Sequence, residues 1–277
     1  MFSATLRSPK VRALATALCD RNAVWVDLKG YDHVPDTVQH VMIDVTPDLA
    51  MEKSPGCDNY LKLATQDGCH EKLFFGNAAS LDSDRVKKIK PMLLRNTIQA
   101  LGITRALIFC RTNWDCELLK RFFDAVNLFD GNENLSSACL GGGLSNDTRR
   151  VNLQKFKNNQ VRFLICTDVA ARGIDLNSLD FLINVTLPDT AEEYVHRVGR
   201  VGRAGKPGLA ISLVSGVAEL VWFVKKKGYK PWYVLRFPNP ASLFANTRLT
   251  LSFIYRKAQP GPRDAQGRPE TTHGLDR

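Results

Sequence analysis

The sequence has no long apolar run, no paired cysteines and no charged leader. No stretch approaches the 18 apolar residues that predict a membrane span, and no positively charged segment opens into an apolar run near Met1. The seven cysteines include no Cys-x-x-Cys pair, and Cys69-His70 has no second ligand pair at zinc spacing. We therefore expect no membrane partner, no zinc site, and an intracellular protein of the nucleus or cytoplasm with reduced core thiols.

Most of the chain also has little net charge. Of the formal net charge of +10, the residues from Lys225 onward contribute eleven Lys and Arg against three Asp and Glu, which leaves +2 for the rest of the 277 residues. Aromatic side chains such as Trp232 and Tyr233 interleave with these basic residues, a mixture that single-strand binders use for phosphate attraction and base stacking. Six of the 13 prolines fall there too, so a disordered tail is the other interpretation.

Short apolar runs alternate with amphipathic segments from residue 105 onward. The runs predict strands at residues 106–110, 137–140, 161–166, 181–185 and 209–214, and the segments between them predict helices at 114–127, 145–156 and 191–198. Residues 38–45 predict one more strand, and residues 92–101 predict a helix that ends at Gly102. This alternation is typical of an α/β domain whose parallel sheet is covered by helices on both faces. We assign no structure or chemistry to residues 48–90.

Two charged segments flank the strand predicted at 181–185. The first reads Thr167-Asp168-Val-Ala-Ala-Arg172-Gly173-Ile-Asp175, and the second reads His196-Arg197-Val-Gly-Arg200-Val-Gly-Arg203. The three arginines, spaced three apart, would share one face of a helix, where their guanidinium groups could hold one phosphoryl group. Taken alone, the same spacing is also that of a solvated helix face.

Together, the two segments resemble the second RecA-like domain of the DEAD-box RNA helicases of superfamily 2. The resemblance implies a doubly wound parallel sheet related to that of P-loop NTPases, and an enzyme that couples ATP hydrolysis to RNA unwinding. Ser3-Ala4-Thr5 resembles the third motif of the family, which ends the first RecA-like domain, so we expect the chain to begin inside a longer protein. Residues 25–30 and 34–40 resemble one member of the family in particular.

This resemblance divides the chain into four parts. We expect the end of the first RecA-like domain at residues 1–28, a linker at 29–37, the second RecA-like domain at 38–216 and a basic tail at 217–277. The linker assignment also has support from composition, because Gly30, Asp32, Pro35 and Asp36 are residues typical of loops.

The resemblance also implies an ATP site shared with the first domain. Arg200 and Arg203 match the paired arginines that reach the γ-phosphate, and Gly173 and Asp175 match positions near the nucleotide ribose. The positions that couple the two domains correspond to Ser3, Thr5, His196 and Arg197. Magnesium would be held mainly by the first domain.

A second set of positions corresponds to RNA-backbone contacts in the family. They are Thr112 in Phe109-Cys-Arg-Thr112, Gly142, Gly143, Arg149, Thr167 and Asp168. The chain departs from the family pattern His-Gly-Gly-x-x-Gln-x-x-Arg, because Gly141 and Asn146 stand at the His and Gln positions. A glycine run is equally a plain tight turn, and Asp168 could instead cap a short helix.

The remaining absences concern the other half of such an enzyme. The chain contains no Gly-x-x-x-x-Gly-Lys-[Ser/Thr] and no Asp-Glu-Ala-Asp, and Lys206 is followed by Pro207 where a magnesium-binding hydroxyl should stand. We therefore expect the chain alone to be inactive as an ATPase. A catalytically silent RNA-binding module is the alternative function.

Overall fold

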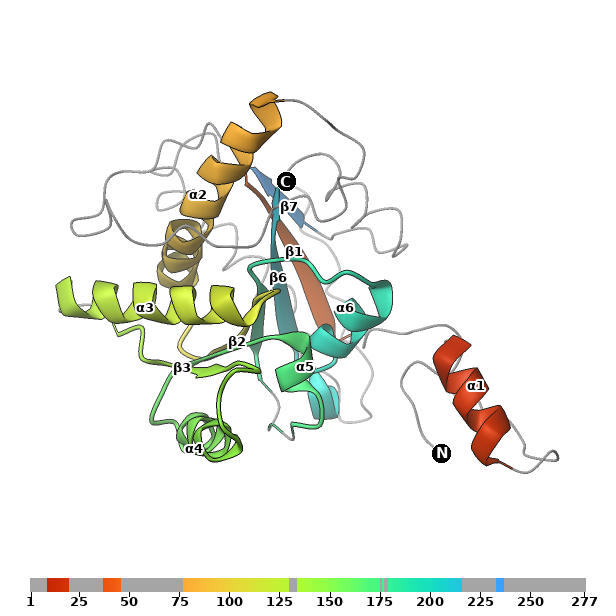
Figure 1. The fold of residues 1–277 in the computed structure, drawn as a ribbon. Helices are drawn as coiled ribbons and strands as arrows, with labels where there is room; N and C mark the ends of the chain where they lie inside the picture. The colour runs from red at the N-terminus through yellow and green to blue at the C-terminus, as the bar shows by residue number, and fades with distance from the viewer. Residues whose placement is uncertain are drawn as a thin grey trace, which may run out of the picture.

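Seven parallel strands form one sheet in the order β3-β4-β2-β5-β6-β1-β7 (Figure 1). The computed structural model describes residues 9–19, 37–45, 77–129, 134–174, 176, 179–215 and 233–236. The strands are β1 (Val38–Val45), β2 (Ala106–Phe109), β3 (Ser137–Leu140), β4 (Phe163–Cys166), β5 (Phe181–Asn184), β6 (Gly208–Ser215) and β7 (Tyr233–Arg236). The helices are α1 (Pro9–Leu18), α2 (Asn77–Leu101), α3 (Asn113–Phe129), α4 (Asn146–Lys157), α5 (Asp168–Ala171), α6 (Ala191–Val198) and the 3-10 helix η1 (Arg203–Gly205).

Helices cover the sheet on both faces because each strand directs alternate residues to opposite sides. In β2, Ala106 and Ile108 pack with α2 and α3, whereas Leu107 and Phe109 pack with α4, α5 and α6. Both clusters are buried, and the central strands β2 and β4 consist of apolar residues throughout. The α/β class and the doubly wound parallel sheet are confirmed.

The structure corrects two of the predicted elements. Helix α2 begins at Asn77 rather than at residue 92, and it contains Pro91. A proline inside a helix removes one backbone hydrogen bond, but Val86, Leu93 and Ile98 keep a buried stripe along α2 that packs on the sheet. Strand β7 was not predicted at all. It lies in the predicted basic tail, pairs with β1 and forms one edge of the sheet.

Four of the predicted core thiols lie close to one another. Cys110, Cys116, Cys139 and Cys166 are buried and free of disulfides. Hydrogen bonding between thiols and burial raise the pKa of Cys116 and Cys139, and burial raises that of Cys166. Cys116, Cys139 and Cys166 are therefore unreactive thiols. No group of metal-binding side chains occurs in the described part of the chain.

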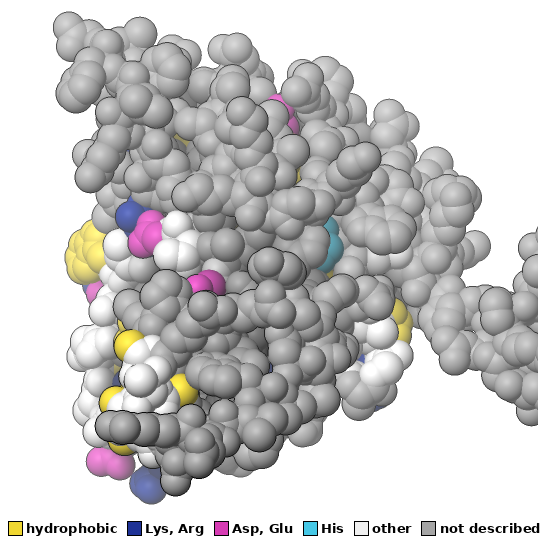
Figure 2. Space-filling model, turned by 90° about the vertical axis from the view of Figure 1, so that its right-hand side faces the viewer, with side chains coloured by type: hydrophobic (Ala, Val, Ile, Leu, Met, Phe, Trp, Pro, Cys, Tyr) yellow, Lys and Arg dark blue, Asp and Glu magenta, His cyan; other side chains and the backbone are white. Residues whose placement is uncertain are grey.

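Helix α1 stands apart from the sheet (Figure 1). The helices α5 and α6 lie at the side of the sheet nearest to α1. The described side chains visible on that side mix hydrophobic, basic and acidic groups without a continuous patch of one kind (Figure 2). None of the helices within the described ranges combines the length and apolar character that crossing a bilayer requires.

Candidate functional site

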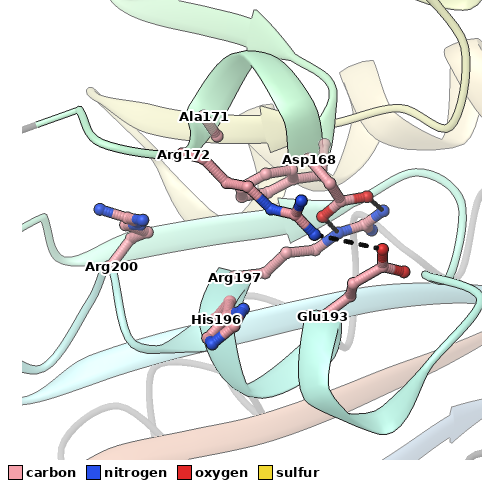
Figure 3. A pocket seen from close by; sticks show the side chains of 8 residues that line it. Asp168, Ala171, Arg172, Glu193, His196, Arg197 and Arg200 are labelled. Atoms are coloured by element: carbon pink, nitrogen blue, oxygen red, sulfur yellow. Dashed lines mark hydrogen bonds and ion pairs between the residues drawn. The ribbon is translucent and has the colours of Figure 1, made fainter. Parts of the chain in front are cut away.

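The predicted RNA contacts follow the carboxyl ends of the strands β2, β3 and β4, which meet at one edge of the sheet. We call this the carboxyl edge. Parallel α/β sheets bind ligands at this edge. The structure places a pocket there, between α5 and α6 (Figure 3). Its lining consists of Phe109, Asp168, Ala171, Arg172, Glu193, His196, Arg197 and Arg200.

The strongest interaction in the pocket joins Asp168 of α5 to Arg197 of α6. The Arg197 Nε donates to Asp168 Oδ1, and Nη2 donates to Oδ2, both at 2.6 Å. The Arg197 side chain is 1% exposed and that of Asp168 is 20% exposed. Two short charge-assisted bonds in this geometry fix both side chains.

The rest of the Arg197 guanidinium is bound within the same domain. Its Nη1 donates to Asn184 Oδ1 at 3.0 Å and to the Thr186 carbonyl at 2.7 Å. The guanidinium also lies 4.8 Å from the centre of the Phe109 ring. Any effect of Arg197 on another domain must therefore be indirect, through the residues that it holds.

The three arginines do not share a helix face, so that prediction is wrong. Helix α6 ends at Val198 with Gly199 as its C-cap, and only Arg197 belongs to the helix. Gly202 has a φ of 68°, a left-handed conformation that breaks the helical path. Arg200 and Arg203 therefore extend from the turn after α6 and from η1, not from the helix that carries Arg197.

Arg200 lies on the opposite side of the pocket from Asp168 (Figure 3). Its Nη1 donates to the Ile174 carbonyl at 2.9 Å, and no described residue accepts from its other N–H groups. Desolvation by burial lowers the pKa of Arg200, and the nearby charge of Arg203 adds to this. A guanidinium with remaining donors beside a like charge is suited to an anion such as a phosphoryl group.

Arg203 is the second arginine predicted to reach a phosphoryl group. Its Nε donates to the Gly199 carbonyl at 2.8 Å, so its stem folds back over the end of α6. Its charge lies near that of Arg200. The two arginines are thus brought together, as predicted, although by a turn and not by a helix.

An ion pair and a histidine also line the pocket. Arg172 pairs with Glu193 at 3.6 Å, and His196 extends from α6 below them (Figure 3). His196 is partly buried, and its predicted role in contacting another domain remains a prediction.

Thr112 closes the first turn of α3. Its hydroxyl accepts the Asp115 N–H at 3.0 Å and donates to the Asp115 carboxylate at 2.8 Å. Thr112 is therefore a helix cap in this structure, and its predicted RNA contact remains a prediction.

The glycine loop, residues 141–143, follows β3 and contacts the start of α3. The Gly142 N–H donates to Asn113 Oδ1 at 2.7 Å, so it is not the bare donor that the sequence predicted. A Cβ on Gly142 would lie 2.8 Å from Asn113 Nδ2, whereas one on Gly143 would meet nothing within 4 Å. The open backbone of this loop is that of Gly143.

The other predicted RNA residues lie nearby with different exposure. Arg149 of α4 reaches the Ala170 carbonyl of α5 at 3.5 Å and is partly buried. Thr167 is 7% exposed. Thr167 is also the N-cap position of α5, so the alternative in which Asp168 caps that helix is wrong.

Some predicted residues cannot be placed. Ser3, Thr5 and Asp175 lie outside the described residues. Gly173 is described and has a φ of 71°, a conformation that favours glycine. Its predicted position near a nucleotide remains a prediction.

The sequence analysis missed residues that support the site. Asn184 and Thr186 hold Arg197, and Asn113 holds the glycine loop. Asn184 ends β5 and Thr186 follows it closely, so their position at a strand end was the available signal, whereas Asn113 begins α3.

Comparison with known proteins identifies the domain. A family model described as the helicase conserved C-terminal domain matches residues 89–205. The ATP-dependent RNA helicase DDX1 of Xenopus laevis is 41% identical over 228 residues, and Ddx1 of Drosophila melanogaster is 44% identical over 224 residues. The chain contains a DEAD-box helicase C-terminal domain. The resemblance drawn from residues 167–175 and 196–203 is confirmed, and DDX1 is the member that residues 25–30 and 34–40 resembled.

Each of these two DEAD-box relatives is matched over 80% of this chain and 30% of its own length. Among solved structures, S. cerevisiae Dbp5 bound to RNA and ADP BeF3 gives a TM-score of 0.61 at 21% identity, over 93% of this chain and 54% of that chain. The C-terminal domain of the DEAD-box protein Dbp5 gives a TM-score of 0.51 at 19% identity, over 78% of this chain and 98% of that chain. These likenesses show the RecA-like fold.

Proposed function

We propose that this domain is the arginine-bearing half of an ATP-dependent RNA helicase. ATP and Mg²⁺ would lie between it and a first RecA-like domain that supplies the phosphate loop and most of the magnesium ligands. The names of the DDX1 relatives support this activity, and the Dbp5 structure with RNA and ADP BeF3 supports both ligands.

The observation that carries the proposal is the buried pair of Asp168 and Arg197. Asp168 begins α5 just after β4, where RNA contacts are predicted, and Arg197 stands three residues before Arg200. The pair thus connects the predicted RNA contacts rigidly to the turn that presents Arg200. RNA bound at one side would set the position of the arginines at the other.

The domain's own residues have distinct tasks in this proposal. Arg200 and Arg203 would neutralise the negative charge that builds up on the γ-phosphate during transfer. Arg149, Thr112 and the Gly143 backbone would hold RNA phosphates, with little selection among bases.

The test compares two proteins. The chain alone should show no RNA-stimulated ATP hydrolysis, whereas a fusion to the P-loop domain of a DEAD-box relative should hydrolyse ATP faster when single-stranded RNA is added. A folded fusion that binds RNA but never hydrolyses ATP would favour the silent RNA-binding module. Hydrolysis by the chain alone would contradict the division of labour between domains.

A further inference from the structure

A tryptophan lies exposed at the start of α3, next to the predicted RNA contacts. Trp114 is 51% exposed, although side chains of this size usually bury most of their surface. It is the second residue of α3, and the Thr112 cap fixes the turn that carries it. Trp114 therefore contributes only part of its surface to the fold.

The same turn is attached to the glycine loop. Asn113, which precedes Trp114, accepts the Gly142 N–H at 2.7 Å. Both Asn113 and Gly143 are exposed. Trp114 therefore directly follows the residue that holds the glycine loop, and the family resemblance assigns it no role there.

The indole ring is supported on one face. The Arg121 guanidinium lies over the ring, 5.7 Å from its centre, and Arg121 pairs with Glu117 at 3.7 Å. A ring held in this way loses little freedom when a second group stacks on its open face. The guanidinium also adds positive charge close to where a phosphate backbone would run.

We propose that Trp114 stacks on a base of single-stranded RNA whose backbone lies along Thr112 and the glycine loop. The inference rests on the proposed function, and it adds a base contact to residues that are otherwise proposed to contact only the RNA backbone. Stacking on an aromatic ring tolerates any base, because every base has a π face. It therefore increases affinity without introducing sequence preference.

The test uses the full chain and two fluorescently labelled strands, a short oligouridine and an abasic ribose-phosphate strand of the same length. Trp114→Ala should weaken oligouridine binding about tenfold and leave binding of the abasic strand unchanged. Trp114→Phe should retain most of the affinity. Phe129→Ala is the matched control, because Phe129 is an aromatic residue of the same helix that is 63% exposed at the opposite end.

Two results would overturn the inference. If Trp114→Ala binds both strands as the parent does, the exposed ring has no part in RNA binding. If it weakens both strands equally, the effect arises from the cap and the glycine loop, not from stacking. Arg149→Ala separates the inference from the proposed function, since loss of a backbone contact should weaken both strands. If Trp114→Ala weakens only oligouridine binding and Arg149→Ala weakens neither strand, stacking is supported and the proposed backbone contact of Arg149 is contradicted.

Discussion

Arg197 and Asp168, 29 residues apart in the chain, form a bidentate ion pair beneath the carboxyl edge of the sheet. Both guanidinium bonds to the carboxylate are 2.6 Å long, and the arginine is buried. Burying such a pair costs little free energy as long as both partners are present, because their attraction offsets the loss of hydration. Either partner alone would be a poorly compensated buried charge.

Asp168→Asn should therefore lower the free energy of unfolding of the domain by about 3 kcal/mol. The reason is that Arg197 would keep its buried charge and lose its counter-charge. Urea denaturation followed by circular dichroism measures this change. The double variant Asp168→Asn with Arg197→Met should recover part of the loss, because it removes the buried charge as well.

Arg111→Met is the control for this prediction. Arg111 pairs with Asp189 at 2.9 Å, but the two side chains are 31% and 55% exposed, so the loss should stay below about 1 kcal/mol. Equal losses for Asp168→Asn and Arg111→Met would contradict the structural importance of the buried pair.

Arg200→Ala should lower ATP turnover of the fusion by about two orders of magnitude or more at saturating RNA. RNA affinity should change little, because Arg200 lies on the opposite side of the pocket from Asp168 (Figure 3). Arg200→Lys should not restore turnover, since a lysine lacks the planar fork of donors.

Steady-state hydrolysis and RNA titration together test the role of Arg200. Arg150→Ala serves as the control, because Arg150 is 82% exposed on α4 and pairs only with Asp147 at 3.5 Å among the described residues. Parent-like turnover in Arg200→Ala would assign this arginine to the fold and not to the reaction.

The sequence predicted the sheet better than it predicted the site. Strands β2 and β4 are continuous apolar runs of four residues, so they could be located from local pattern alone. The pair of Asp168 and Arg197 depends instead on where α5 and α6 meet in space, which no local pattern encodes. The spacing of three arginines suggested one helix, but Gly199 ends α6 before Arg200.

Strand β7 and the first half of α2 were missed for other reasons. β7 has only four residues and lies among basic and proline-rich segments. In α2, the predicted helix began only at residue 92, although the buried stripe from Val86 to Ile98 continues across Pro91. Tertiary packing on the sheet stabilises a helix that local propensity interrupts.

Gly202→Ala should destabilise the domain more than Gly205→Ala. Both glycines have positive φ values, 68° and 74°, so an alanine costs about 1–2 kcal/mol of backbone strain at either position. At Gly202 the new Cβ would also lie 2.4 Å from Val38 Cγ2, whereas at Gly205 it meets nothing within 4 Å. The clash with β1 should add about 2 kcal/mol. Urea unfolding of the two variants measures the difference between their losses in free energy of unfolding. Equal losses would show that backbone strain accounts for the whole effect and that the clash with β1 adds nothing.

The last prediction concerns which part of the chain attracts RNA. Arg149→Ala should weaken binding of single-stranded RNA and flatten the salt dependence, with a slope of log K against log salt reduced by about 0.7 for one phosphate contact. The comparison is with the variant in which Lys225, Lys226 and Lys227 are all changed to Gln. Deletion from Lys225 onward would be a poor comparison, because it removes β7 from its pairing with β1.

The three lysine-to-glutamine substitutions should also reduce the slope of log K against log salt, because tail lysines attract RNA without contacting a defined site. The two effects should add in a combined variant, since Arg149 lies on α4 against Ala170 of α5 and the lysines lie elsewhere in the sequence. Suppose that Arg149→Ala keeps both the affinity and the slope of the parent, while the lysine substitutions remove the salt dependence. The attraction then comes from the charge of the tail, and the proposed RNA-backbone contacts at the carboxyl edge are wrong.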